Sequence, residues 1–320
     1  MRVLQLVQKP QRRGAEIFAA QLSAALRRGG DTVATCYLYP YPDADALALL
    51  PGDQVLGGVE RHPLEKIPGV HPGLLRRALQ AIRAFQPDVV QLNGARSVKY
   101  GALAKRLMRR PEWVAIYRNI DHPGYWQRRR SQLAVYRRWV MPQIDGVVGV
   151  SAATLEAVQA LYRLRGPAVV IRNGIDPQSL DMIEPVPENG AAGAPALLFV
   201  GNLTVQKRPD RFLRAAARVQ AALPALRVWL VGDGPLRAEL EAQAQRLGLN
   251  ARFWGYQRAV GPWIAASDLL AVTSDSDGIP AVVLEAGYLA RPTVATRVGG
   301  MAECVIDGET GLLVEAQDEA

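Results

Sequence analysis

Residues 269–285 read LLAVTSDSDGIPAVVLE, and this stretch predicts the fold of the chain. It starts as a short apolar run typical of a buried strand, passes through a polar loop, and continues from Pro280 as a helix. A strand that leads through a loop into a helix is the unit that builds ligand sites in α/β proteins. Asp277 in the loop and Glu285 in the helix are eight positions apart. Because the loop amides and the helix dipole favour an anion, we expect a ligand site there.

The same alternation of strand and helix continues along the rest of the chain. It fills the first half, is interrupted at residues 184–195 by a linker rich in Pro, Gly, Glu and Ala, and resumes at Leu197. Alternation of this kind implies parallel sheets covered by helices, so we predict an α/β protein with two Rossmann-like domains, residues 1–183 and 196–320, facing each other across a cleft. The expected strands are residues 2–7, 31–39, 88–92, 113–117, 145–150, 197–200, 227–231, 251–254 and 269–274, and the expected helices are residues 15–28, 74–85, 100–109, 151–162, 210–222 and 236–247.

Composition is that of an ordinary globular protein. Apolar residues make up 49% of the 320 residues and charged residues 21%. No apolar run approaches the ~18 residues of a membrane-spanning helix, and the N-terminal residues are typical of a first strand rather than of a signal peptide. Cys36 and Cys304 match no metal-binding spacing, so we expect reduced thiols in a cytoplasmic protein.

Charge is divided unevenly along the chain. Residues 1–180 carry 26 Lys and Arg against 13 Asp and Glu, whereas residues 181–320 carry 12 against 17. The basic first half supports a domain boundary and indicates a negatively charged partner. Residues 125–141, from Tyr125 to Met141, hold five Arg, two Trp and two Tyr. This pattern suits the anionic inner face of a membrane; it also suits nucleic acid, which we do not expect as a partner, or the solvated face of an ordinary amphipathic helix.

Asp277 and Glu285 resemble the acid–seven-residue–acid motif of glycosyltransferase family 4, a retaining group with the GT-B fold. The resemblance implies that Asp277 contacts the transferred sugar and that Glu285 holds the ribose hydroxyls of the nucleotide. Gly278, Ile279 and Pro280, which lie between them, would line the same donor site. The family usually has Glu where this chain has Asp277, which is one methylene shorter.

Residues 198–209, LFVGNLTVQKRP, resemble the strand and loop that bind the donor diphosphate in that family. Lys207 fits the family's lysine, Asn202 replaces its usual arginine, and Arg208 follows directly, where it would compensate for Asn202. A cation is needed because negative charge builds on the departing nucleotide diphosphate. Gly14 resembles the loop glycine whose amide approaches the phosphates at the start of a helix.

The first domain also resembles the family on its acceptor side. The family often places a histidine after a middle strand of this domain, and here that strand leads into Arg118, Asn119 and, three residues later, His122. We assign these three residues to the acceptor side. Residues 231–235 resemble the family's Gly-x-Gly-Pro turn into a helix and are interpreted as a tight structural turn. Residues 254–256 match the segment that borders the nucleotide base in the family, although Trp254 and Tyr256 fit core or rim packing equally well. Residues 296–313 match the family's closing pattern and are interpreted mainly as markers of the fold.

The resemblance therefore implies a retaining glycosyltransferase of hexosyl type that uses a UDP- or GDP-sugar. The acceptor would be a hydroxyl group in cell-surface polysaccharide or lipid-linked glycan synthesis. Asp277, Glu285 and Lys207 are the expected catalytic residues. We expect no metal or other cofactor, because the nucleotide sugar is a co-substrate and the family uses protein cations for this chemistry.

Two further interpretations stay open. A GT-B relative with epimerase or phosphorylase chemistry would share the fold, and a decayed GT-B module would bind membrane or nucleic acid through the basic first half without catalysis. The loss of the family's Arg and Glu at Asn202 and Asp277 fits a decayed site. The chain also stops at Ala320, where family members continue with helices that pack on the first domain, so the resemblance implies a truncated second domain.

Overall fold

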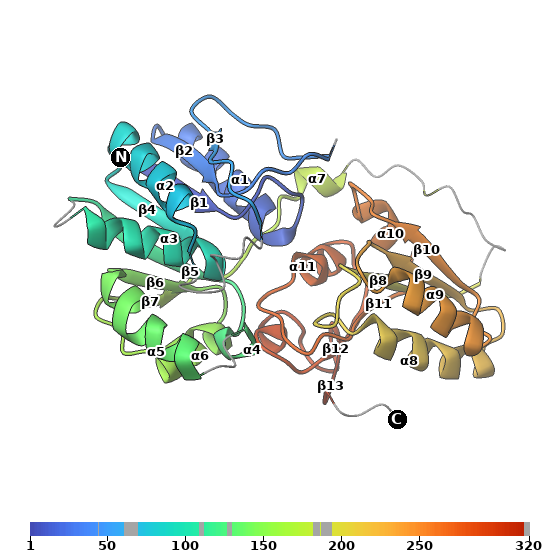
Figure 1. The fold of residues 1–320 in the computed structure, drawn as a ribbon. Helices are drawn as coiled ribbons and strands as arrows, with labels where there is room; N and C mark the ends of the chain where they lie inside the picture. Colours follow the sequence, from blue (N-terminus) through green and yellow to red (C-terminus); the bar gives the residue numbers. More distant parts are fainter. Residues whose placement is uncertain are drawn as a thin grey trace. The chain divides into compact units, whose positions relative to one another are not determined.

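The computed structural model describes residues 1–43, 45–60, 70–108, 112–126, 130–181, 186 and 194–316. The chain forms two compact units, Met1–Arg172 and Asn173–Ala320. Each unit is built on one parallel β-sheet with helices packed against it (Figure 1), which confirms the predicted fold class of two Rossmann-like sheets. Most of the predicted linker at residues 184–195 lies outside the described residues.

The first unit contains a seven-stranded sheet with the order β3-β2-β1-β4-β5-β6-β7. The strands are β1 (Arg2–Val7), β2 (Thr32–Tyr37), β3 (Gln54–Val55), β4 (Val89–Asn93), β5 (Val114–Asn119), β6 (Gly146–Gly149) and β7 (Ala168–Val170). The helices are α1 (Gly14–Arg28), α2 (Pro72–Phe85), α3 (Gly94–Leu107), α4 (Pro123–Trp126), α5 (Arg130–Val135) and α6 (Ala152–Leu161). Leu4, Leu6 and Leu92 are fully buried in the core between them.

Polar side chains define where several of these helices begin. The Leu74 amide donates to Nδ1 of His71 at 3.1 Å, just before α2. Ser151 begins α6 as predicted, because its hydroxyl accepts from the Thr154 amide at 3.1 Å in a capping box. Helix α3 starts at Gly94, six residues earlier than predicted. The prediction missed this first part because its Gly- and Ser-containing first turn shows no clear apolar period.

The arginine- and tryptophan-rich segment is helical where it is described. After α4 and the undescribed residues 127–129, the chain passes from α5 into a π-helix at Tyr136–Val140 and a 3₁₀ turn at Met141–Gln143. Across the described residues, none of the helices combines the length and apolarity needed to cross a bilayer.

The second unit contains a six-stranded sheet with the order β10-β9-β8-β11-β12-β13. The strands are β8 (Ala196–Val200), β9 (Arg227–Val231), β10 (Ala251–Gly255), β11 (Leu269–Val272), β12 (Thr293–Thr296) and β13 (Gly311–Val314). The helices are α7 (Gln178–Asp181), α8 (Pro209–Ala222), α9 (Arg237–Arg246), α10 (Gly261–Ala265) and α11 (Ala281–Tyr288), and a 3₁₀ turn covers Met301–Glu303. The sheet has a core on each face, one around Trp229 and Trp263 and the other around Phe199 and Phe212.

In each sheet the chain adds strands first toward one edge and then, from the starting strand, toward the other edge. The point where this direction reverses determines where a ligand can bind. In the first unit the reversal falls between β1 and β4, and in the second unit it falls between β8 and β11. The loops that leave two such strands run in opposite directions, so a crevice forms at the carboxyl ends of the strands. In the second unit these two loops carry Lys207 and Asp277.

Candidate functional site

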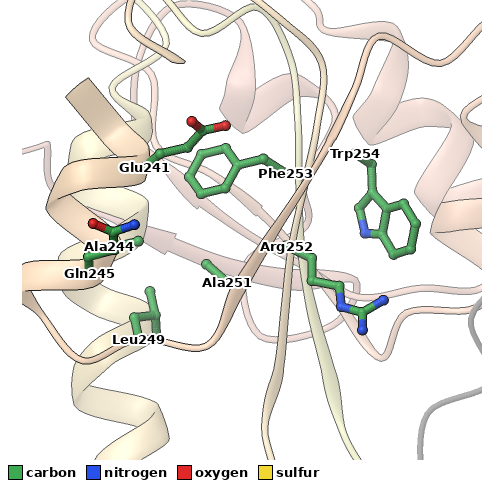
Figure 2. A pocket seen from close by; sticks show the side chains of 8 residues that line it. All are labelled: Glu241, Ala244, Gln245, Leu249, Ala251, Arg252, Phe253 and Trp254. Atoms are coloured by element: carbon green, nitrogen blue, oxygen red, sulfur yellow. The ribbon is translucent and has the colours of Figure 1, made fainter. Parts of the chain in front are cut away.

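One hollow of about 450 Å³ lies at the outer strand β10 of the second unit (Figure 2). Phe253 points toward α9 and Trp254 points away from it, so the hollow wraps around the edge of the sheet. Trp254 belongs to the segment matched to the border of the nucleotide base, but the residues assigned to catalysis, the donor diphosphate and the acceptor do not line this hollow. We therefore locate the candidate site from the strand ends, where charged side chains converge, and not from this hollow.

The loops after β8 and β11 are joined by hydrogen bonds into one rigid element. The Asp275 amide donates to the Gln206 carbonyl at 2.9 Å, and the Gln206 side chain donates to the Ser276 carbonyl at 2.9 Å. The Thr273 hydroxyl donates to the Arg208 carbonyl at 2.8 Å. Any movement of one loop therefore moves the other.

Lys207 and Asp277, which belong to two separate predicted motifs, form an ion pair in this element. The Ser274 hydroxyl also donates to Asp277 at 3.1 Å. The lysine side chain is 25% exposed and the aspartate side chain 13%. Because water only partly screens the pair, its attraction is stronger than that of an open surface pair. A donor phosphate would compete with Asp277 for the Lys207 ammonium group.

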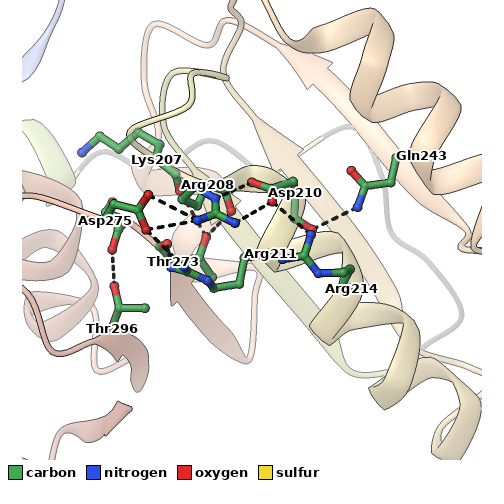
Figure 3. Close-up of polar contacts among 10 residues, drawn as sticks. Lys207, Arg208, Asp210, Arg211, Arg214, Gln243, Thr273, Asp275 and Thr296 are labelled. Carbon is green, nitrogen blue, oxygen red and sulfur yellow. Dashed lines mark hydrogen bonds and ion pairs between the residues drawn. The ribbon is translucent and has the colours of Figure 1, made fainter. Parts of the chain in front are cut away.

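Arg208 turns away from this pair toward carboxylates of its own (Figure 3). Its Nε and Nη2 donate to the two oxygens of Asp210 at 2.9 and 3.0 Å, and its Nη1 lies 3.3 Å from Asp275. Partial burial would raise the pKa of Asp210, but hydrogen bonds from Arg208 and Arg214 lower it to about 2. The positive charge of Arg208 is therefore balanced within the protein.

Asp275 also holds Arg211, which sequence patterns did not single out. Arg211 is buried, donates to Asp275 at 3.1 Å and to the Thr273 carbonyl at 2.8 Å. Asp275 thus connects the start of α8 to the end of β11. The acidic run of Asp275 and Asp277 after a strand was the available signal, but the partners of Asp275 lie more than 60 positions away in the sequence.

Asn202 lies in the loop after β8, half-buried, with its carbonyl accepting from the Thr204 amide at 2.8 Å. The neighbouring loop after β9 packs tightly against this one. Gly232 has φ of +129°, and a Cβ there would overlap the Gly201 carbonyl. The predicted Gly-x-Gly-Pro turn therefore allows close packing of one loop on the other.

The acidic loop is held by a turn after β12. The Gly300 amide donates to the Gly278 carbonyl at 3.1 Å, and a Cβ at Gly299, whose φ is +53°, would overlap the Asp277 carbonyl. On the other side, the Asn173 side chain donates to the Ile279 carbonyl at 3.1 Å. Gly278, Ile279 and Pro280 are all buried. Pro280 caps α11, so the helix begins one residue later than predicted.

Glu285 lies in α11 about one turn after its first residue, Ala281. Its carboxylate is half-buried and has no hydrogen-bond or ion-pair partner among the residues that the structure describes. Burial raises its pKa. A carboxylate in this state can accept two hydrogen bonds from a ligand that carries adjacent hydroxyl groups.

In the first unit, Gly14 and Arg118 occupy different environments. Gly14 is the exposed first residue of α1, with no atom within 4 Å of a Cβ built on it. Arg118, at the end of β5, is only 3% exposed. Its guanidinium lies 3.7 Å from the centre of the Phe18 ring, and burial lowers its pKa to about 9.

Asn119 and His122 make mainly structural contacts. The buried Asn119 side chain donates to the Thr154 carbonyl at 3.0 Å and accepts from the Tyr117 hydroxyl at 2.9 Å. His122 is exposed, and its Nδ1 accepts from the Gly124 amide at 3.1 Å, in the first turn of α4. The Asn119 side chain therefore points into the first unit, and the His122 side chain contacts the start of the following helix, α4.

Both cysteines are free thiols. Within the described parts of the chain, no three His, Cys, Asp or Glu side chains are grouped so that they could hold a metal ion.

Comparison with known families gives two matches, one for most of each unit. Residues 12–179 match the family described as Glycosyltransferase Family 4, and residues 194–320 match the family described as Glycosyl transferases group 1.

Two similar curated proteins are named for the biosynthesis of a polysaccharide and of a lipopolysaccharide core. The Vi polysaccharide biosynthesis protein VipC/TviE of Salmonella typhi is 39% identical over 119 residues, which are 37% of this chain and 20% of that protein. The lipopolysaccharide core biosynthesis glycosyltransferase LpsE of Rhizobium meliloti is 34% identical over 129 residues, 40% of this chain and 37% of that protein. The chain thus covers well under two-thirds of the length of either relative.

A solved structure shares the fold over the whole chain. Anabaena HepE, crystallised with UDP and glucose, superposes with a TM-score of 0.79 at 22% sequence identity, covering 100% of this chain and 87% of that one.

Proposed function

Because this chain belongs to glycosyltransferase family 4, we propose that it moves a sugar from a nucleotide diphosphate donor to a hydroxyl acceptor, with retention at the anomeric carbon. The observation that carries the proposal is the pairing of Lys207 with Asp277 where the strand order reverses between β8 and β11. A cation and an acid at this point are suited to bind a diphosphate and the sugar attached to it. The UDP and glucose bound to HepE make a UDP-sugar the first donor to test, with a GDP-sugar as the alternative.

In this proposal each side chain at the reversal point has one task. Lys207 balances the charge that builds on the diphosphate as its bond to the anomeric carbon breaks. Asp277 orients the sugar, and Glu285 accepts hydrogen bonds from the ribose hydroxyls. The acceptor oxygen forms the new bond to the anomeric carbon, and its proton leaves with the nucleotide diphosphate. Arg208 contributes through its position, because its charge is already balanced by Asp210 and Asp275.

The remaining predicted residues are assigned to the donor side on the second unit or to the first unit in the proposal. Gly278, Ile279 and Pro280 present the start of α11 to the donor, and Asn202 borders the loop that carries Lys207. On the first unit, Gly14 offers its amide, and Arg118, Asn119 and His122 shape the strand end on the acceptor side. The polysaccharide context of VipC/TviE and LpsE supports a glycan or lipid-linked acceptor.

Nucleotide binding gives the direct test of the donor site. We expect UDP, at 100 times its dissociation constant, to stabilise the protein by about 2.7 kcal/mol, because it binds only the folded state. Replacing Glu285 with alanine removes the acceptor of the ribose hydroxyls and should lower the affinity roughly tenfold to a hundredfold. Thermal shift with UDP, GDP and ADP on both proteins measures this effect and identifies the base.

Glu309→Ala is the matched control, because Glu309 is an exposed glutamate of the same unit. It should leave nucleotide binding unchanged. If no nucleotide stabilises the folded wild type, the donor-site proposal is wrong.

A second function, docking on an anionic membrane, is favoured by one cluster in the first unit. Trp139 is 41% exposed. Val135, four residues earlier in the chain, and Leu107, the last residue of α3, are also exposed. The Arg106 guanidinium lies 4.2 Å from the Trp139 ring centre. Basic groups beside exposed aromatic and aliphatic side chains suit the headgroup region of a membrane.

Co-sedimentation with vesicles tests this docking. We expect binding to phosphatidylglycerol vesicles but not to phosphatidylcholine vesicles, and binding that weakens as salt is raised. Trp139→Ala should reduce it several-fold. Leu312→Ala, which alters a still more exposed apolar side chain of the second unit, should not. Equal binding to both kinds of vesicle would contradict an electrostatic docking surface.

A further inference from the structure

The reversal of strand order in the first unit has charged residues of its own. Lys9 follows β1 by two residues, and Arg96 lies in the first turn of α3, directly after β4. β1 and β4 are the two strands between which the order of this sheet reverses. The same rule that locates a ligand at Lys207 in the second unit therefore locates one at Lys9 and Arg96.

These two cations converge on a single carboxylate. Lys9 Nζ lies 3.0 Å from Oε2 of Glu60, and Arg96 Nη1 lies 3.4 Å from Oε1 of the same side chain. The Gln8 side chain donates to Oε1 at 3.1 Å. Glu60 thus shows which group the pair can hold: an anion with at least two oxygens, one for each cation.

An aromatic ring lies within cation–π distance of each of the two cations. Lys9 Nζ lies 5.5 Å from the centre of the Tyr41 ring, and the Arg96 guanidinium lies 5.5 Å from the centre of the Tyr39 ring. Both tyrosines come from the segment after β2. A cation that already packs against a ring loses less side-chain entropy when a ligand binds than a freely moving surface cation does.

Other charged side chains surround Lys9 and Arg96, and both remain accessible. Lys9 and Arg96 face the carboxylate of Glu60, and Arg13 lies exposed at the start of α1. The acids Asp43 and Asp45 act on the nearby Tyr41 together with Arg13. Glu16, the nearest other acid on α1, is buried and is influenced by both Lys9 and Arg13. The side chains of Lys9, Glu60 and Arg96 are 17%, 34% and 32% exposed, so a ligand can reach them.

We propose that Lys9 and Arg96 bind an anionic group, a carboxylate or a phosphate, on the acceptor substrate. In the ligand-free protein, Glu60 occupies the place of that group. The proposal rests on the proposed transferase function, because it assigns the donor to Lys207 on the second unit and a negatively charged acceptor to the first. Glu60 then acts as an internal competitor that an acceptor with the right charge displaces.

Binding of simple probes to the full chain tests the proposal. Isothermal titration with glucuronate, glucose 6-phosphate and glucose separates a carboxylate, a phosphate and an uncharged sugar. We expect at least one anionic probe to bind and glucose to bind more weakly. The double variant Lys9→Ala/Arg96→Ala should lower the affinity of that probe about tenfold or more, because it removes two charge-assisted contacts.

Glu60→Gln should change the affinity in the opposite direction. It keeps the shape of the side chain but removes the charge that competes with the ligand, so the anionic probe should bind several-fold more tightly. The control is Arg28→Ala/Arg76→Ala, which removes two exposed arginines of the same unit and changes the net charge equally. It should leave probe affinity within about twofold of the wild type, since long-range effects are screened by salt.

The outcomes separate this proposal from the proposed function. If neither anionic probe binds, if the control weakens binding as much as the double variant, or if Glu60→Gln weakens it, the anion site is wrong. Should the double variant not fold, the direction of the Glu60→Gln effect still decides. UDP binding measured on the same samples reports on the donor site alone. If the wild type binds the anionic probe but no nucleotide, the proposed donor site is wrong while the anion site stands.

Discussion

Replacing Lys207 with alanine is expected to lower the turnover of a nucleotide-sugar donor by about 10²- to 10³-fold, as removal of one preorganised electrostatic contact does in other enzymes. The reason lies in the loop after β8, where the charges of Lys207 and Arg208 have different partners. Arg208 is balanced by Asp210 and Asp275, whereas Lys207 forms an ion pair only with Asp277 among the residues that the structure describes. Release of nucleotide diphosphate from the identified donor, with saturating acceptor, measures the loss.

Two further variants show whether the loss comes from charge at this position. Lys207→Arg keeps the positive charge and should recover part of the turnover. Arg208→Ala should act by another route, because it leaves Asp210 and Asp275 without their shared partner and lowers the melting temperature. Lys207→Ala also leaves the half-buried Asp277 without its cation, so turnover is compared at a temperature at which the wild type and all the variants are folded. A Lys207→Ala protein that turns over its donor at the wild-type rate would refute the assigned role.

Regular elements with strong periodicity were predictable from the sequence. Strand β1 has the predicted bounds, and helix α8 differs by one residue, because apolar side chains recur at the spacing that burial requires. Strands β3 and β7 were not predicted, since runs of two and three residues carry no periodicity. The four-residue strand β12 was not predicted either, and only its last residue, Thr296, falls in the family segment 296–313.

The candidate site was predictable in its members but not in their contacts. The motif around Asp277 and the basic loop with Lys207 were found separately, and the structure brings the two residues together. The sequence gives no signal for the partners of Arg208, because one of its two carboxylates, Asp275, lies 67 positions away. Asn119 was assigned to the acceptor side from its place after a middle strand, and nothing in the sequence indicated its contacts with Tyr117 and Thr154 in the first unit.

Gly299 contributes to the site without any functional group, which makes it a sharp test of the packing argument. It has φ of +53°, and a Cβ there would overlap the carbonyl of Asp277. Two effects therefore add in Gly299→Ala: a left-handed backbone that side chains rarely adopt, and a backbone clash that no rotamer change can relieve.

We expect Gly299→Ala to destabilise the protein by about 3 kcal/mol or more and to lower nucleotide affinity at least tenfold in the fraction that folds. Gly308→Ala separates the two effects, because Gly308 has φ of +82° but no atom within 4 Å of a built Cβ. It should lose only about 1 kcal/mol. Gly287→Ala, in helix α11 with open space around it, should be neutral or slightly stabilising.

Chemical denaturation and UDP titration of the three variants measure both the free energy of unfolding and the nucleotide affinity. If Gly299→Ala matched Gly308→Ala in stability and bound UDP normally, the turn after β12 would not be what holds Asp277 in place, since the clash would have been absorbed without moving the acidic loop.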